Sequence, residues 1–68
     1  MKVSELAEVL YEETPVEICV DFEPVFTGQA IDAKTSKYAF RNVKEVYISL
    51  SGTTLVVSVE NIRTSYKK

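Results

Sequence analysis

The chain has 68 residues, with one cysteine, no histidine and a formal net charge of −2. It is long enough for one small domain, residues 1–68, and a chain of this size buries only about 60% of the surface that it exposes when unfolded. An internal disulfide needs two cysteines and a structural zinc site needs four Cys or His ligands, so the composition excludes both. Close packing or self-association is left to stabilise the fold.

The charged residues are unevenly distributed. Residues 1–23 contain seven acidic residues and one lysine, a net charge of −6, whereas residues 24–68 contain seven basic and three acidic residues, a net charge of +4. An acidic helix on a mildly basic sheet accounts for this pattern, and a dipolar surface that orients a partner is the alternative. The N-terminus lacks an apolar run as long as a signal peptide or membrane helix, and a lone cysteine is typical of a reducing compartment, so we expect a cytoplasmic protein.

A helix is predicted over residues 4–13. Ser4 can cap its first turn, and Glu5 and Glu8 follow where the helix dipole favours anions. Pro15 ends the helix, because proline disfavours a helical conformation of the residue before it. The apolar face of the helix consists of Val3, Leu6, Ala7 and Leu10.

Two strands are predicted next, over residues 16–22 and 25–31, with a turn at Glu23–Pro24. The first strand alternates apolar and polar residues, whereas Gly28 within the second strand indicates a bulge. Residues 32–42 are polar and irregular, which predicts a connecting loop.

A second pair of strands is predicted over residues 46–50 and 55–60, as a hairpin that turns at Ser51–Gly52. A two-residue turn at that position places Tyr47 opposite Val56, and an aromatic residue paired with a β-branched one is favourable.

Together these elements predict an α+β domain, in which the N-terminal helix packs on one face of an antiparallel sheet of about four strands, arranged as two hairpins. Residues 61–68 form a polar tail that we expect to fray. The period-two alternation assigns ten apolar residues to the face that the helix covers. They are Val16, Ile18, Val20, Phe22, Val46, Ile48, Leu50, Leu55, Val57 and Val59.

Catalysis is not expected from this sequence. Histidine, the commonest general base and metal ligand, is missing, and two glycines are too few for a phosphate-binding loop. Cys19 lies between Glu17 and Asp21, whose negative charges disfavour the thiolate that a reactive cysteine needs. The same two carboxylates are about 13 Å apart along the strand, too far to act on one bond. We therefore expect a non-enzymatic protein without a cofactor or a metal ion.

The other face of the predicted sheet is less polar than a solvated face usually is. Since one short helix cannot cover both faces, this face either carries scattered surface apolar residues or binds a partner, which is another protein or a second copy of the chain. Tyrosine is enriched in interfaces, which favours the second interpretation. The candidate interface residues are Cys19, Tyr47, Ser49, Val56 and Ser58.

Two other binding modes fit parts of the sequence. Basic residues with interleaved aromatic rings are typical of modules that bind single-stranded nucleic acid, although the chain as a whole is acidic. The residues of this basic loop are Lys34, Lys37, Tyr38, Phe40, Arg41 and Lys44. The acidic helix fits an inhibitor or nucleic-acid mimic that presents Glu5, Glu8 and Glu12 to a basic partner.

Five stretches carry a resemblance to a known group of proteins. They are Val3–Leu10, Val16–Ile18, Phe26–Gly28, Val43–Ser49 and Leu55–Glu60. Through them the chain resembles short uncharacterised proteins that are encoded by phages and prophages of Gram-positive bacteria. The resemblance implies an accessory role in the cytoplasm of a bacterial host, such as modulating a host or phage protein, and it implies no catalytic or cofactor-binding residue.

Overall fold

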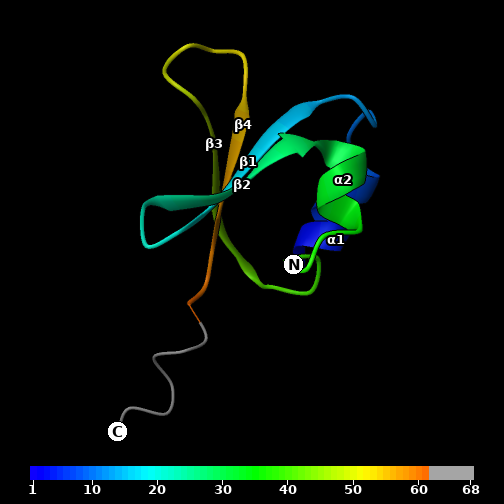
Figure 1. Cartoon of the computed structure of the whole chain (residues 1–68), viewed down its shortest axis with the longest axis vertical. Helices are drawn as coiled ribbons and strands as arrows, with labels where there is room; N and C mark the ends of the chain where they lie inside the picture. Colours follow the sequence, from blue (N-terminus) through cyan, green and yellow to red (C-terminus); the bar gives the residue numbers. More distant parts are fainter. Residues whose placement is uncertain (62–68) are drawn as a thin grey trace, which may run out of the picture.

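The computed structural model describes residues 1–61, which contain two helices and four strands (Figure 1). In chain order the elements are α1 (Val3–Glu8), β1 (Pro15–Val20), β2 (Glu23–Gln29), α2 (Ala30–Lys34), β3 (Val43–Ile48) and β4 (Leu55–Val59). An α+β domain with four strands in two hairpins is therefore confirmed. Apart from Asn61, the predicted tail lies outside the described residues.

The sheet is mixed rather than wholly antiparallel. The strand order is β2-β1-β4-β3, and each hairpin, β1 with β2 and β3 with β4, is antiparallel as predicted. The two central strands, β1 and β4, run parallel, which corrects the predicted antiparallel sheet. Strands β2 and β3 consequently point the same way, because α2 and residues 35–42 carry the chain back across the sheet before β3 begins.

The first hairpin turns at Asp21–Phe22 rather than at Glu23–Pro24. Both turn residues have positive φ, 51° and 70°, as in the type I′ turn whose twist suits a hairpin. Proline is compatible with β2 because β2 is an edge strand, where a missing N–H leaves no ladder bond unmade. Phe22, which the alternation assigns to the core, is 92% exposed at the tip of this turn.

The second hairpin has the predicted register but a longer loop. The backbone N–H of Ser49 donates to the carbonyl of Thr54 over 2.8 Å, so the loop comprises the four residues between them. Gly52 lies in this loop with φ of 77°, a left-handed conformation that favours glycine. Tyr47 lies opposite Val56, as the sequence predicts.

Helix α1 begins earlier and ends sooner than predicted. Lys2 rather than Ser4 precedes the first helical residue, and the backbone N–H of Lys2 donates to the Glu5 carboxylate over 2.8 Å. The helix ends at Glu8, well before the predicted end at residue 13.

Helix α2 lies where the sequence predicts the end of a strand and the start of a loop. The N–H groups of Ala30 and Ile31 donate to the carbonyls of Thr14 and Glu12 over 2.8 and 3.0 Å. These bonds satisfy donors that the first turn of a helix leaves unpaired. Residues 11–14 therefore do not continue α1, because they pair with the start of α2. This is a tertiary contact that no local sequence pattern predicts.

The hydrophobic core lies between the two helices and one face of the central strands. Helix α1 packs on α2, and α2 packs on β1 and β2. The buried core cluster is Val3, Ala7, Val16, Ile18, Ala30, Ala33, Val57 and Val59. Within residues 1–61 no helix is long and apolar enough to cross a membrane.

The predicted core is right for the central strands and wrong at the sheet edge. Of the ten residues assigned to the covered face, those on β1 and β4 are buried or half-buried. Val46, Ile48 and Leu50 are exposed instead, because the helices pack toward β1 and β2 and β3 lies at the opposite edge.

Candidate interaction surface

Four exposed apolar side chains lie close together in sequence, on β3 and in the loop that follows it. Val46, Tyr47 and Ile48 are 42%, 46% and 58% exposed, and Leu50 is fully exposed. Val46 and Ile48 lie on the face of the sheet that carries the helices, and Tyr47 lies on the other face, because side chains alternate along a strand. We refer to these four residues as the β3 strip.

The β3 strip is exposed because of where the helices lie. Figure 1 shows α1 and α2 together beside one part of the sheet, with the loop between β3 and β4 (yellow) standing clear of them. Four strands at about 4.8 Å spacing are wider than the roughly 10 Å diameter of a helix. One predicted helix is therefore too narrow to cover ten inward-facing residues on four strands. The sequence alone thus indicates that some of these residues are exposed.

The two edges of the sheet differ in how far they are protected against pairing with another strand. In β2, Pro24 lacks an N–H, and the register shifts so that Val25 has no partner on β1. This bulge lies at Val25 and not at Gly28, where an added Cβ would lie 3.0 Å from the Phe26 ring. Proline, bulges and charges are the usual protection of an edge strand.

Strand β3 has such protection only at its start. A register shift surrounds Lys44, and Glu45 follows it with a second charge. From Val46 to Ile48 the register is regular and the residues carry neither charge, proline nor glycine. The centre of β3 is therefore an unprotected apolar edge among the described strands.

The candidate interface predicted on the second face is assembled on one side of the sheet. Tyr47 lies opposite Val56, and Cys19 lies beside Ser58 across the parallel central pair. Cys19 and Val56 are already buried by their neighbours, so Tyr47 contributes most of the apolar area that a partner could reach. The Ser49 hydroxyl, in contrast, accepts the backbone N–H of Thr54 over 3.2 Å and helps to close the hairpin loop.

Cys19 is the buried thiol of this face. Burial raises the pKa of the Cys19 thiol above its ordinary value, and a hydrogen bond to the Glu17 carboxylate, 3.4 Å away, and the charge of that carboxylate raise it further. A protonated, buried thiol is a poor nucleophile.

The predicted basic loop is only partly free for nucleic acid. The Tyr38 ring is half-buried and has the Lys37 ammonium and the Arg41 guanidinium at 5.5 and 5.6 Å from its centroid. Lys34 is 3.5 Å from the Glu8 carboxylate. Phe40 and Lys44 are exposed, Phe40 before β3 and Lys44 within it. Two cations thus lie near one aromatic ring, but this half-buried ring is not freely available to stack on a nucleobase.

The three acidic residues proposed for a basic partner do not share one helix. Glu5 and Glu8 belong to α1, and each has a partner within the chain, Lys2 and Lys34 respectively. Glu12 lies beyond the end of α1, in the segment that pairs with α2. Glu12 is therefore not on the helix that carries the other two.

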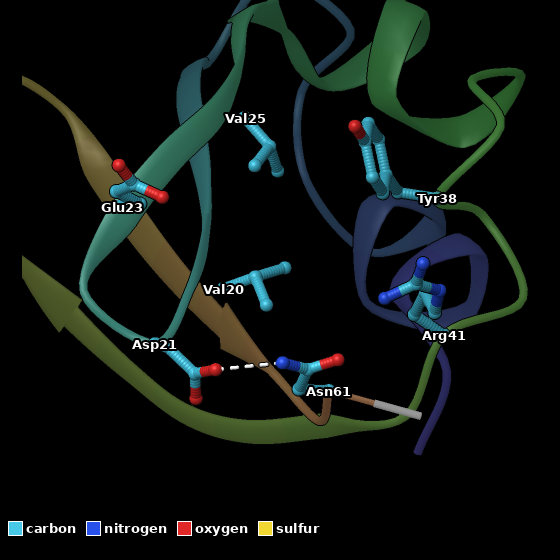
Figure 2. A pocket seen from close by; sticks show the side chains of 7 residues that line it. All are labelled: Val20, Asp21, Glu23, Val25, Tyr38, Arg41 and Asn61. Atoms are coloured by element: carbon cyan, nitrogen blue, oxygen red, sulfur yellow. Dashed lines mark hydrogen bonds between the residues drawn. The ribbon is translucent and has the colours of Figure 1, made fainter. Parts of the chain in front are cut away.

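A cleft of about 390 Å³ opens where the helices leave the ends of β1 and β2 uncovered (Figure 2). Val20 and Val25 lie on one side of it, with Tyr38 and Arg41 across from them. The guanidinium of Arg41 donates to the carbonyl of Glu60 over 3.3 Å. The carboxylate of Asp21, also in the lining, accepts the Asn61 amide over 2.7 Å, so these polar side chains already have partners within the chain. No group of three or more His, Cys, Asp or Glu side chains in residues 1–61 could hold a metal ion.

Comparisons of the chain with protein-family models, with curated proteins and with solved structures find no match, so the surface itself has to indicate a function.

Proposed function

We propose that this protein is non-enzymatic and acts by binding protein chains, including copies of itself, through the β3 strip. The observation that carries the proposal is the exposure of four apolar side chains on and beside one unprotected edge strand of so small a domain. Contiguous exposed apolar surface on a small protein is typical of interaction sites.

The size of the domain supports the same proposal. A chain of 68 residues has little apolar surface to bury, and this one exposes Val46, Ile48 and Leu50 instead of placing them in the core. Covering these side chains with a partner removes apolar surface from water at roughly 25 cal/mol per Å². The resemblance to phage-encoded proteins fits an accessory role of this kind in a bacterial host cytoplasm.

The two alternative functions have less support. Stacking of a nucleobase needs a free ring, and the half-buried Tyr38 ring already has two cations beside it, which leaves Phe40 as the exposed ring of the basic loop. The acidic-inhibitor hypothesis needs its carboxylates on one helix, and Glu12 is not on the helix that carries Glu5 and Glu8.

The proposal predicts that Ile48→Lys abolishes self-association. A lysine at the centre of β3 places a charge in the surface that a partner would cover, whereas the folded monomer already exposes this position. Sedimentation equilibrium between about 5 and 500 μM should show a mass above that of the monomer for the natural chain and the monomer mass for the variant.

Val9→Lys is the matched control, because Val9 is also an exposed apolar residue but lies just after α1, away from β3. This control should associate like the natural chain. A natural chain that stays monomeric over the whole range, or equal loss of association in both variants, would overturn the proposed function.

A further inference from the structure

We propose that the partner of β3 is β3 of a second copy, paired antiparallel about a two-fold axis at Tyr47, so that two four-stranded sheets join into one. This inference rests on the proposed function and specifies the occupant of the β3 strip and its register.

The hydrogen-bonding groups of β3 point in the direction that this pairing needs. The N–H of Ser49 points toward β4, where it donates to Thr54. Along an antiparallel pair the direction alternates from residue to residue, so Tyr47 also pairs with β4, while the N–H and C=O groups of Val46 and Ile48 point outward. Four outward groups are thus available for a strand of another chain.

The outward groups match a second copy in one register. With Tyr47 on the axis, Val46 lies opposite Ile48 of the second copy, and the reverse pair forms as well. Each of these pairs can exchange both backbone hydrogen bonds, giving four in total. On the two faces the pairing sets tyrosine beside tyrosine and valine beside isoleucine, which are favourable cross-strand neighbours.

Registers that move the axis toward the start of β3 are also less favourable, because of the charges there. A two-fold axis normal to the sheet keeps each face continuous only if it passes through a residue. Each neighbouring register therefore places the axis at the next residue along the strand. With the axis at Val46, Glu45 lies opposite Tyr47 and Lys44 opposite Ile48 of the second copy. With the axis at Glu45, the two copies of Glu45 lie opposite each other, and like charges in that position are destabilising.

The interface of this pair is small. The four side chains of the β3 strip, three of them only partly exposed, offer less than the roughly 800 Å² per partner of a standard interface, so we expect a weak, reversible dimer. The net charge of −2 per copy adds only weak repulsion.

Single cysteines test the register directly. In a chain whose own thiol is removed by Cys19→Ala, Tyr47→Cys places the two new thiols opposite each other on the axis, at a separation that a disulfide can span. Glu45→Cys and Ser49→Cys are the matched controls, since each is two residues from the axis and its own copies are about 13 Å apart. An equimolar mixture of the two controls, however, sets residue 45 opposite residue 49.

Under mild oxidation at about 200 μM, we expect covalent dimer to form at least about tenfold faster with Tyr47→Cys than with either control alone, and the mixed controls to form a heterodimer. Equal rates for all three single variants, or homodimers of a control formed faster than the mixture, would overturn the register. The mass of the natural chain separates the two proposals. A non-covalent dimer without the Tyr47→Cys cross-link refutes the register alone, and a monomer refutes both.

Discussion

Phe22 shows how a single residue can carry strain without contributing to the core. It adopts φ of 70° at the tip of the first hairpin, and its ring is exposed. A left-handed conformation costs a residue with a Cβ roughly 1–2 kcal/mol, whereas glycine adopts it freely. Because the ring is exposed, its packing offsets little of that cost.

We predict that Phe22→Gly increases the free energy of unfolding by about 0.5–1 kcal/mol, after allowing for the extra freedom of glycine in the unfolded chain. Urea denaturation followed by circular dichroism measures this change. Asp21→Gly is the matched control, because Asp21 also has positive φ but its carboxylate accepts the Asn61 amide over 2.7 Å, and losing that bond offsets the relief of strain. A Phe22→Gly variant less stable than the natural chain would contradict the expectation.

Cys19 links stability to pH. Because burial and Glu17 raise the pKa of its thiol above the ordinary value of 9.0, the folded chain holds this proton more tightly than the unfolded chain does. The stability that follows is complete below pH 9 and falls as the pH rises through the folded-state pKa.

We expect the natural chain to lose more stability than Cys19→Ala between pH 7.5 and pH 10.5, although the variant is less stable at pH 7.5 because it leaves a cavity. Denaturation curves at the two pH values provide the comparison, and the lysines and tyrosines that titrate in this range are common to both chains. An equal loss in both would show that Cys19 does not contribute to the pH dependence.

Strands β3 and β4 differ sharply in how much each contributes to the core, although they form one hairpin. Val46 and Val57 are cross-strand partners with the same side chain, yet Val57 is buried and Val46 is exposed. We predict that Val57→Ala lowers the free energy of unfolding by about 2 kcal/mol and that Val46→Ala lowers it by less than about 1 kcal/mol. Chemical denaturation at a concentration where the chain is monomeric checks both, and equal losses would contradict this one-sided core.

The elements that could be predicted are those whose signal is local. Period-two alternation located β1, β3 and β4 to within a few residues, and the second hairpin kept its register because its turn residues lie where the alternation stops. The helices were harder to predict, since α2 begins where its first N–H groups donate to the carbonyls of Glu12 and Thr14, which lie in a distant segment just after the end of α1. The first turn lies two residues before the predicted one. Pro24 is typical of a turn, but it is also compatible with an edge strand such as β2.

At the scale of the whole molecule, the sequence predicted the class of fold but not the way in which the hairpins join. The parallel pairing of β1 and β4 connects residues about forty positions apart, such as Val16 and Leu55, and nothing in either strand distinguishes a parallel neighbour from an antiparallel one. For the same reason the candidate interaction surface of the structure differs from the one that the sequence predicts. Three of the four residues of the β3 strip were assigned to the core, because only the final strand order shows that β3 is at an edge.

The unequal edges of the sheet determine how far an assembly of this chain could grow. If two copies pair through β3, both open edges are used at once, and the joined sheet ends on a β2 strand at each side. There Pro24 and the bulge at Val25 prevent an incoming strand from forming a regular ladder of backbone hydrogen bonds. Growth would stop at two copies, so the same exposed strand that invites association would give a closed pair rather than a fibre.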